Sequence, residues 1–265
     1  AVRPSRFHSR LSLNASRGVE KSHKSQQDAQ EFLLFILNAL HEEFAATGKA
    51  ATGESFITNS FQGQLLSSLA CSDCGHTSET YEDFFHLSVT IQESVPLHHV
   101  ELEQVLAAEF ALEERLEGEN RWHCERCGVR VNATRKASLH RLPQIIVLHL
   151  KRFAFTDARK AKKVRTHVTL PAASSTSLGS IDFGAFVSTP QVDREVCYDI
   201  VSIVNHHGRD AMCGHYTAHC RHCVDGRWYV FDDDRVEAIR FEEAWLPQEA
   251  YMVWLQRRSP SPKPD

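Results

Sequence analysis

The stretch Cys213-Gly-His-Tyr-Thr-Ala-His-Cys220, followed by Gly226-Arg-Trp-Tyr-Val-Phe-Asp-Asp-Asp234, brings a histidine and three consecutive carboxylates into two neighbouring segments. Both segments alternate apolar and polar residues, which predicts two antiparallel strands joined by a turn. A carboxylate on one ring nitrogen of histidine fixes its tautomer, while the other nitrogen accepts a proton. His215 and Asp232 are therefore candidates for two members of a catalytic triad. The simpler interpretation is a hydrophobic hairpin with a polar loop.

Strand patterns continue on both sides of this hairpin. Residues 198–205, 216–220, 228–231 and 251–255 are consecutive strand candidates and predict an antiparallel sheet. Residues 144–150 form a nearly unbroken run of β-branched residues and leucine, which is typical of a strand buried on both faces. The second half of the chain is therefore expected to form the sheet that carries His215.

Two cysteine knuckles, Cys71-Ser-Asp-Cys74-Gly and Cys124-Glu-Arg-Cys127-Gly, indicate a metal site. A two-residue spacer lets two thiolates of one tight turn bind the same ion, and the glycine allows the backbone to fold back. The long gap between the knuckles places them on separate hairpins that meet in space. Four sulfur ligands leave no open coordination position, so we predict one structural zinc ion.

The alternative for these cysteines is two disulfides or four unrelated thiols. The sequence shows no signal peptide, transmembrane run or Arg-rich transit peptide, and CxxC pairs in cytosolic proteins favour metal. A third pair, Cys220 and Cys223, falls where the chain alternates like a strand. Residues three apart on a strand point to opposite faces, so we interpret this pair as incidental.

The first half of the chain predicts helices and long hairpins. One helix is expected to begin with Ser25 as its cap, and its apolar residues recur at helical spacing: Leu33, Ile36, Leu37, Leu40 and Phe44. A second helix is expected over residues 100–117. Residues 56–89 alternate in short runs, as in hairpins with a metal at their tip. Residues 45–53 predict a loop, 171–190 a surface excursion, and 259–265 a disordered tail.

Length and charge limit the possible functions. With 265 residues, 42% hydrophobic content and a formal net charge of −4, the chain can bury one large core and gives no support for nucleic-acid binding. The basic run at 159–165 is interpreted as a solvated loop. We expect one lobed domain that is monomeric, cytoplasmic and/or nuclear, and not attached to a membrane.

These segments together resemble the ubiquitin-specific protease family, papain-like thiol proteases that cleave after the carboxyl-terminal glycine of ubiquitin. The matching segments occur in the family's order over nearly the whole chain. They are Gln27-Asp-Ala-Gln-Glu-Phe-Leu33, Phe61-Gln-Gly-Gln-Leu65, Phe84 to Leu87, the two knuckles, Leu142-Pro143, Leu148-His-Leu-Lys-Arg-Phe153, Tyr198-Asp199, Asn205-His206, Gly214-His-Tyr-Thr-Ala218, Trp228-Tyr229, Phe231-Asp-Asp233 and Ala250-Tyr251.

The resemblance implies an α+β, papain-like fold with a thumb, zinc-bearing fingers and an antiparallel-sheet palm, in one domain over residues 1–258. Residues 1–50 would be a remnant of the thumb. Chemistry would occur where thumb and palm meet, with His215 as the base that later protonates the leaving amine. Asp232 stands at the orienting position, its neighbour Asp233 is the alternative, and Asp234 is expected to face solvent.

The resemblance also implies how ubiquitin and ubiquitinated proteins would be bound. The tail of ubiquitin ends in two glycines, so a narrow groove admits it and excludes side chains. Tyr216, Phe153 and His206 are candidates for the wall of that groove. Asp28, beside Gln27, corresponds to the acid that contacts the basic tail, and it is also simply the acid at a helix start.

One departure from the family pattern concerns the nucleophile. The family carries its cysteine in a box containing asparagine and glycine, ahead of the Gln27 segment, and residues 1–25 contain neither this box nor any cysteine. We expect an amino-terminally truncated sequence whose parent holds the cysteine, so that this chain alone is inactive. The alternative is a catalytically inactive ubiquitin-binding scaffold. Cys213 is too close to His215 in sequence to align with it and still admit a peptide.

Overall fold

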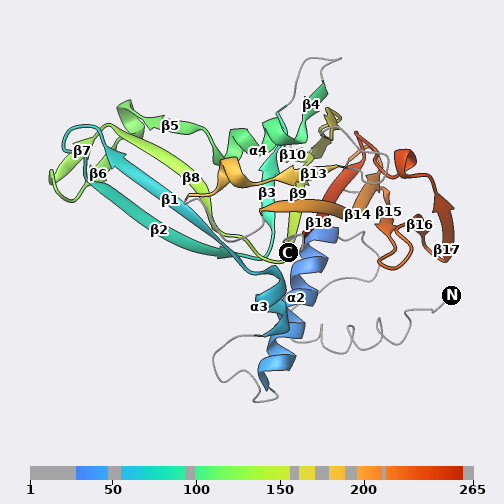
Figure 1. The fold of residues 1–265 in the computed structure, drawn as a ribbon. Coiled ribbons are helices and arrows are strands. Elements are labelled where there is room, and N and C mark those ends of the chain that lie inside the picture. The colour runs from blue at the N-terminus through green and yellow to red at the C-terminus, as the bar shows by residue number, and fades with distance from the viewer. Residues whose placement is uncertain are drawn as a thin grey trace, which may run out of the picture.

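The computed structural model describes residues 28–46, 55–92, 99–155, 161–170, 179–188, 196–210 and 213–258. These residues form two sheet-rich lobes (Figure 1): an elongated lobe of long hairpins and a broader lobe built on a large sheet. Two helices, α2 (Ala29–Ala46) and α3 (Phe56–Phe61), lie together below the junction of the lobes in this view. The architecture is the α+β fold of thumb, fingers and palm that the sequence predicted.

The palm is built on a sheet with the strand order β17-β16-β15-β14-β18-β9-β3, to which β13 adds by pairing with β14. Only the β3–β9 pair is parallel. The strands are β3 (Leu87–Thr90), β9 (Ile145–Lys151), β13 (Ser180–Asp182), β14 (Cys197–His207), β15 (His215–Arg221), β16 (Trp228–Asp232), β17 (Arg235–Ile239) and β18 (Ala250–Arg257). The predicted succession of antiparallel strands from β14 onward is confirmed.

Strand β9 separates two layers of the core. Ile146, Leu148 and Leu150 face the larger cluster, which includes helix α4 (Leu102–Phe110). Val147 faces the smaller cluster, which includes the buried side of α2 and α3. All four of these β9 side chains are fully buried, so the prediction of a strand buried on both faces is confirmed.

The fingers are a second sheet with the order β2-β1-β8-β5. Its strands are β1 (Gly63–Cys71), β2 (Thr77–Phe84), β5 (Glu113–Leu116) and β8 (Ala133–Arg141), with the hairpin β6 (Trp122–Cys124) and β7 (Val129–Val131) beside them. The remaining short pairs are β10 (Phe153–Phe155) with β11 (Ala161–Lys163), and β4 (His99–Glu101) with β12 (His167–Thr169).

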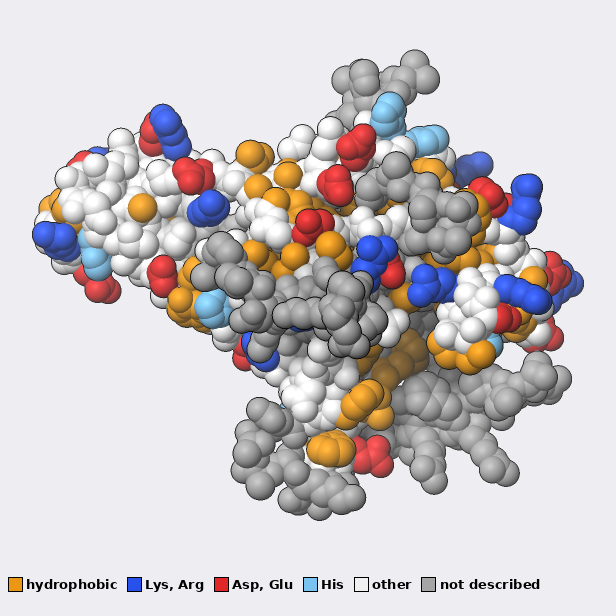
Figure 2. Space-filling view, viewed as in Figure 1, with side chains coloured by type: hydrophobic (Ala, Val, Ile, Leu, Met, Phe, Trp, Pro, Cys, Tyr) orange, Lys and Arg blue, Asp and Glu red, His pale blue; other side chains and the backbone are white. Residues whose placement is uncertain are grey.

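The surface carries both signs of charge. Figure 2 shows acidic and basic side chains interspersed over both lobes of the face that it presents. Among the residues that the structure describes, no helix is long and apolar enough to cross a membrane.

Helix α2 corrects the predicted helix start. It begins at Ala29, and Asp28 accepts hydrogen bonds from the first turn, while Ser25 lies outside the described residues. Leu33 and Leu37 are buried as predicted, but Leu40 is 43% exposed. The apolar stripe was therefore too wide, because α2 packs on the palm along only part of its surface.

Residues 56–61 form helix α3 rather than a strand. A capping box between Ser55 and Thr58 starts this helix: Ser55 Oγ accepts from Thr58 N at 3.1 Å, and Thr58 Oγ1 accepts from Ser55 N at 2.7 Å. The two reciprocal bonds satisfy donors that a helix start leaves open. The alternation of apolar residues was a poor guide here, because a helix of six residues is too short to show its period.

Two other predicted segments differ from the structure. The helix expected over 100–117 ends at Phe110, and Glu113–Leu116 pairs with β8 as an edge strand. The excursion expected over 171–190 includes β13 and the fully buried Phe183 in its described part, because β13 pairs with β14. In both places a tertiary strand pairing outweighs the local composition.

Candidate active site and metal centre

His215 and Asp232 are brought together at the ends of two neighbouring strands. His215 is the first residue of β15, and Asp232 is the last residue of β16. The Nε2 atom of His215 lies 2.5 Å from Oδ1 of Asp232, and each side chain is 47% exposed. The two groups predicted to act together are therefore in hydrogen-bond contact at an accessible edge of the palm.

The contact defines the state of the histidine ring. The hydrogen bond to Asp232 holds the pKa of His215 above its usual value, and Asp233 adds a smaller effect in the same direction. Because Asp232 accepts the Nε2 proton, Nδ1 carries the lone pair that can take a proton from a nucleophile. By contrast, burial lowers the pKa of His206 and His207.

The turn after Asp232 explains which of the three aspartates faces the ring. Asp232 pairs with Arg235 across a two-residue turn, and Asp233 adopts a left-handed φ of 51° that aspartate tolerates better than most residues. A carboxylate oxygen of Asp233 also lies within 4.8 Å of the other two groups. The choice of Asp232 as the orienting acid stays a prediction.

Asp28 accepts three hydrogen bonds from residues that the structure describes. Its Oδ1 accepts from the backbone N–H of Gln30 at 2.7 Å and of Glu31 at 3.2 Å, while its Oδ2 accepts from the hydroxyl of Tyr251 at 2.5 Å. The carboxylate thus caps α2 and joins it to β18. A carboxylate has about four acceptor positions, so Asp28 can still accept a bond from a ligand. Gln27 lies outside the described residues.

The three predicted wall residues form one aromatic cluster. Phe153 meets the ring of His206 edge-on at 5.1 Å, and Tyr216 meets it at 4.8 Å. Tyr251 lies 5.4 Å from Phe153 and 6.0 Å from Tyr216 between ring centroids. His206 is only 1% exposed, so it supports the cluster from behind, whereas Phe153 and Tyr216 are partly exposed.

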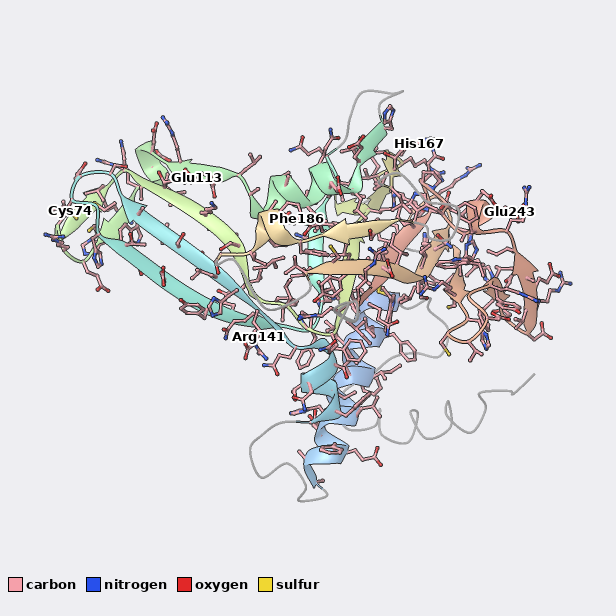
Figure 3. All side chains as sticks on the ribbon, in the orientation of Figure 1. Cys74, Glu113, Arg141, His167, Phe186 and Glu243 are labelled. Carbon is pink, nitrogen blue, oxygen red and sulfur yellow. The ribbon has the colours of Figure 1, made fainter. Side chains whose placement is uncertain are left out.

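The four knuckle cysteines meet at the tip of the fingers, where Figure 3 labels Cys74. The sulfur atoms of Cys71 and Cys127 are 3.9 Å apart, and those of Cys74 and Cys124 are 3.7 Å apart. A tetrahedral zinc with bonds of about 2.3 Å requires sulfur atoms about 3.8 Å apart. The donor set and its spacing fit one structural zinc ion, and the two knuckles lie on separate hairpins as predicted.

Two of the remaining cysteines, Cys213 and Cys220, do not have the properties of a nucleophile. Cys213 is exposed, and its thiol contacts Oδ1 of Asp210 at 3.5 Å, which raises its pKa. Burial raises the pKa of Cys220, which contacts Ser202 across the sheet, while Cys223 lies in the turn after β15. A nucleophilic cysteine needs a lowered pKa, so the environments of Cys213 and Cys220 disfavour thiolate formation.

A model of the family described as ubiquitin carboxyl-terminal hydrolase matches residues 1–254. The chain belongs to this family. It is 33% identical over 287 residues to ubiquitin carboxyl-terminal hydrolase 2 of Gallus gallus, covering 98% of this chain and 76% of the chicken protein. It is 32% identical to the Homo sapiens protein of the same name, again over 98% of this chain but only 44% of the human protein.

Solved structures of this family share the fold. The SAGA DUB module of Ubp8, Sgf11, Sus1 and Sgf73 bound to monoubiquitin matches with a TM-score of 0.80 and 29% identity, covering 96% of this chain and 53% of that chain. The same module bound to ubiquitin aldehyde gives a TM-score of 0.78 at 27% identity, covering 96% and 54%. The chain thus spans about half the length of these hydrolase subunits.

The sequence missed two features of the site region. Tyr251 was quoted only as part of a motif, although its hydroxyl holds Asp28. Lys163 was assigned to a solvated loop, but its side chain is wholly buried and lies in β11. No local pattern could have found these contacts, because each joins residues far apart in the chain.

Proposed function

We propose that the protein is a thiol-dependent ubiquitin carboxyl-terminal hydrolase that releases ubiquitin from proteins by cleaving after its terminal glycine. The observation that carries this proposal is the 2.5 Å contact between His215 and Asp232, at the accessible ends of two palm strands in a chain of this family. Relatives that are 32–33% identical bear the name of this activity, and a solved neighbour holds monoubiquitin.

The chemistry follows from the state of His215. Nδ1 takes the proton of a cysteine thiol, the sulfur attacks the terminal glycine carbonyl, and a carbon–sulfur bond forms as the carbon–nitrogen bond breaks. The protonated ring then gives its proton to the leaving amine. A water molecule, deprotonated by the same ring, hydrolyses the thioester and restores the thiol. Asp232 fixes the tautomer and stabilises the charged ring at each stage.

Ubiquitin recognition is assigned to the region between α2 and the palm. Asp28 stands at the start of α2, where its carboxylate can accept charge-assisted hydrogen bonds from a basic tail. Phe153 and Tyr216, partly exposed beside it, would form an aromatic wall that admits the glycine-terminated tail and excludes larger side chains. His206 supports that wall.

The proposal requires a nucleophile from outside these residues. Four cysteines are metal ligands, and Cys213 and Cys220 have raised pKa values. We propose that the thiol belongs to a cysteine box ahead of Gln27 in the parent protein. We also propose a reducing compartment such as the cytoplasm or nucleus, because the sulfur atoms of the four knuckle cysteines have the spacing of a metal site.

Hydrolysis of a fluorogenic ubiquitin carboxyl-terminal reporter tests the proposal. The 265-residue chain alone should be inactive, whereas the protein extended upstream to include the cysteine box should turn the reporter over, and His215→Ala should abolish that activity. Activity of the short chain that disappears in Cys213→Ser would contradict the nucleophile assignment. An extended protein that carries the box, binds ubiquitin and hydrolyses nothing would favour the inactive scaffold.

A further inference from the structure

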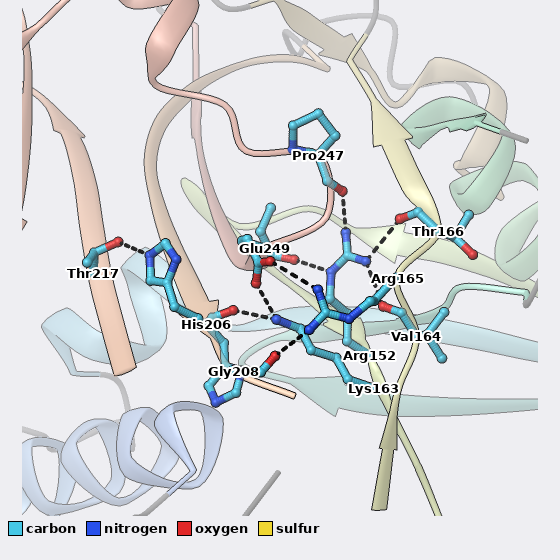
Figure 4. A network of polar contacts seen from close by, with 12 residues as sticks. Arg152, Lys163, Val164, Arg165, Thr166, His206, Gly208, Thr217, Pro247 and Glu249 are labelled. Atoms are coloured by element: carbon cyan, nitrogen blue, oxygen red, sulfur yellow. Dashed lines mark hydrogen bonds and ion pairs between the residues drawn. The ribbon is translucent and has the colours of Figure 1, made fainter. Parts of the chain in front are cut away.

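Lys163 is a buried cation outside the catalytic pair. Its Nζ donates to the main-chain carbonyl of His206 at 2.5 Å and to the carboxylate of Glu249 (Figure 4). Burying an ion pair carries a large desolvation cost, and well-packed apolar residues often serve stability equally well. A role in positioning the backbone at His206 would account for the burial of the Lys163–Glu249 ion pair.

The backbone that Lys163 holds is the end of β14. The ladder between β14 and β18 closes at Asn205 and Ala250, followed by one bond of 2.9 Å from His206 N to Glu249 O. Lys163 then supplies the donor for the next carbonyl, that of His206. Beyond the end of the β14–β18 ladder, a side chain therefore supplies the hydrogen bond to the β14 backbone that strand β18 no longer supplies.

A second cation holds the main chain two residues further on. Arg165 Nη2 donates to the carbonyl of Gly208 at 2.9 Å, and its Nη1 lies 3.7 Å from Oε1 of Glu249. The two oxygens of Glu249 are thus shared between Lys163 and Arg165. The three side chains form a clamp on the main chain of His206 and Gly208.

The clamped residues stand directly against the start of β15. His207 and His215 are the last pair of the β14–β15 ladder. A Cβ atom placed on Gly214 would lie 2.4 Å from Nε2 of His206, and one placed on Gly208 would lie 2.5 Å from the carbonyl oxygen of Cys213. The backbone of Gly214 and the ring of His206 are therefore packed in direct contact. A shift of His206 must move Gly214 and, with it, the next residue, His215.

We propose that Lys163, together with Glu249 and Arg165, positions the catalytic histidine by fixing the end of β14 against Gly214. This inference rests on the proposed function in one respect, the role of His215 as the base. The other buried cation, Arg152, serves as a contrast. It donates to four carbonyls, of Val164, Thr166, Pro247 and Ala250, and none of them belongs to β14.

The test compares Lys163→Met with the matched control Lys162→Met, which changes an exposed lysine of the same strand. NMR titration of the His215 ring in the 265-residue chain reports its contact with Asp232 without requiring activity. In Lys163→Met the pKa of His215 should fall toward its ordinary value. In the extended, active protein kcat should fall by roughly tenfold or more, with KM changing less, because misplacement of a reacting group lowers the rate of the chemical step.

The comparison of Lys163→Met with Lys162→Met can overturn the proposed positioning role of Lys163. A folded Lys163→Met variant whose melting temperature drops while its His215 titration and kcat match those of Lys162→Met would overturn it, since that is the behaviour of a merely structural pair. If Lys163→Met does not fold, Arg165→Met, whose side chain is 49% exposed, replaces it, and an unchanged His215 titration would again overturn the inference. If the extended protein hydrolyses no reporter, the proposed function fails, while the titration still tests the positioning of His215.

Discussion

The hydroxyl of Tyr251 donates a 2.5 Å hydrogen bond to Oδ2 of Asp28, joining residues that are 223 positions apart in the chain. The bond ties the first turn of α2 to the second residue of β18, the strand beside the one that ends at His207. The palm therefore helps to set the position of Asp28. Its structural role and its proposed role in ubiquitin recognition can be separated by substitution.

Asp28→Asn should keep the cap of α2 and lose the charge. Asparagine caps helices as well as aspartate does, so the free energy of unfolding should change little, whereas Asp28→Ala should lower it by about 1 kcal/mol. Ubiquitin binding by the 265-residue chain is expected to be weak, on the order of tens of micromolar or worse. Loss of a charge-assisted bond should weaken it by roughly a further tenfold in Asp28→Asn.

NMR titration with labelled ubiquitin measures this effect, and Asp28→Arg should weaken binding at least as much because like charges would meet. Tyr251→Phe is the matched control, since it removes the hydroxyl and leaves the Asp28 charge in place. Equal affinity of Asp28→Asn and the unaltered chain would assign Asp28 to the helix start alone.

The contact between His215 and Asp232 predicts a pH-dependent stability. Because Asp232 raises the folded-state pKa of His215, the stability contributed by the contact is fully present below the unfolded-state pKa and is lost as the pH rises through the folded-state pKa. Asp232→Asn should therefore destabilise the chain more at about pH 5.5 than at about pH 8.5. Urea denaturation at the two pH values measures the difference.

Asp233→Asn provides the matched comparison at the neighbouring carboxylate. It should lower the pKa of His215 less than Asp232→Asn does, since only Asp232 accepts the ring proton at hydrogen-bond distance. In the extended, active protein the loss of kcat should follow the same order. A greater loss in Asp233→Asn would reverse the choice of the orienting acid.

How much of this could be predicted from the sequence depended on the range of the interactions. The knuckles and β9 were predicted because a few adjacent residues determine each of them. The knuckles follow from CxxC followed by glycine, and β9 follows from an unbroken apolar run. Residues 113–116 were assigned to a helix because their strand character comes only from pairing with β8. Lys163 was assigned to a solvated loop because it lies in a basic run of the sequence. Its partner, Glu249, is 86 residues away, so the ion pair leaves no local signal. The contact of Asp28 with Tyr251 is equally invisible in the sequence.

The zinc site predicts one metal ion per chain. Cys74→Ser should lower the affinity for zinc by at least about a hundredfold, because even loss of a residue behind a ligand costs ten- to a hundredfold. The fingers should then melt at a lower temperature, since binding energy at such sites is coupled to folding. Mass spectrometric metal analysis and thermal melts check both statements, with Cys223→Ser, a change at an exposed cysteine in the turn after β15, as the control. Folded wild-type protein without zinc would contradict the assignment.

His149 predicts a loss of stability in acid. Burial lowers its folded-state pKa to about 4, a shift that Asp28 opposes and that His86 and Lys151 reinforce. Its Nδ1 lies 3.0 Å from Oγ of Ser88, and its ring meets that of Tyr251 at 4.8 Å. The folded protein binds this proton less readily than the unfolded chain, whose histidine titrates near pH 6.5. The stability that neutral His149 provides is therefore present above about pH 6.5 and is lost as the pH falls through about 4, at a cost on the order of 3 kcal/mol.

Replacing the His149 ring by an amide that does not titrate should make the stability of the protein depend less on pH below neutrality. The free energy of unfolding of His149→Gln, measured in urea between about pH 7 and pH 4, should depend less on pH than that of the unaltered chain, even if it is lower at pH 7. His99→Gln, at an exposed position of β4, is the matched control and should keep the slope. His86, whose pKa burial also lowers, contributes in the same direction, so His86→Gln should remove a further part of the slope. Equal slopes for His149→Gln and His99→Gln would show that the folded-state pKa of His149 is not lowered.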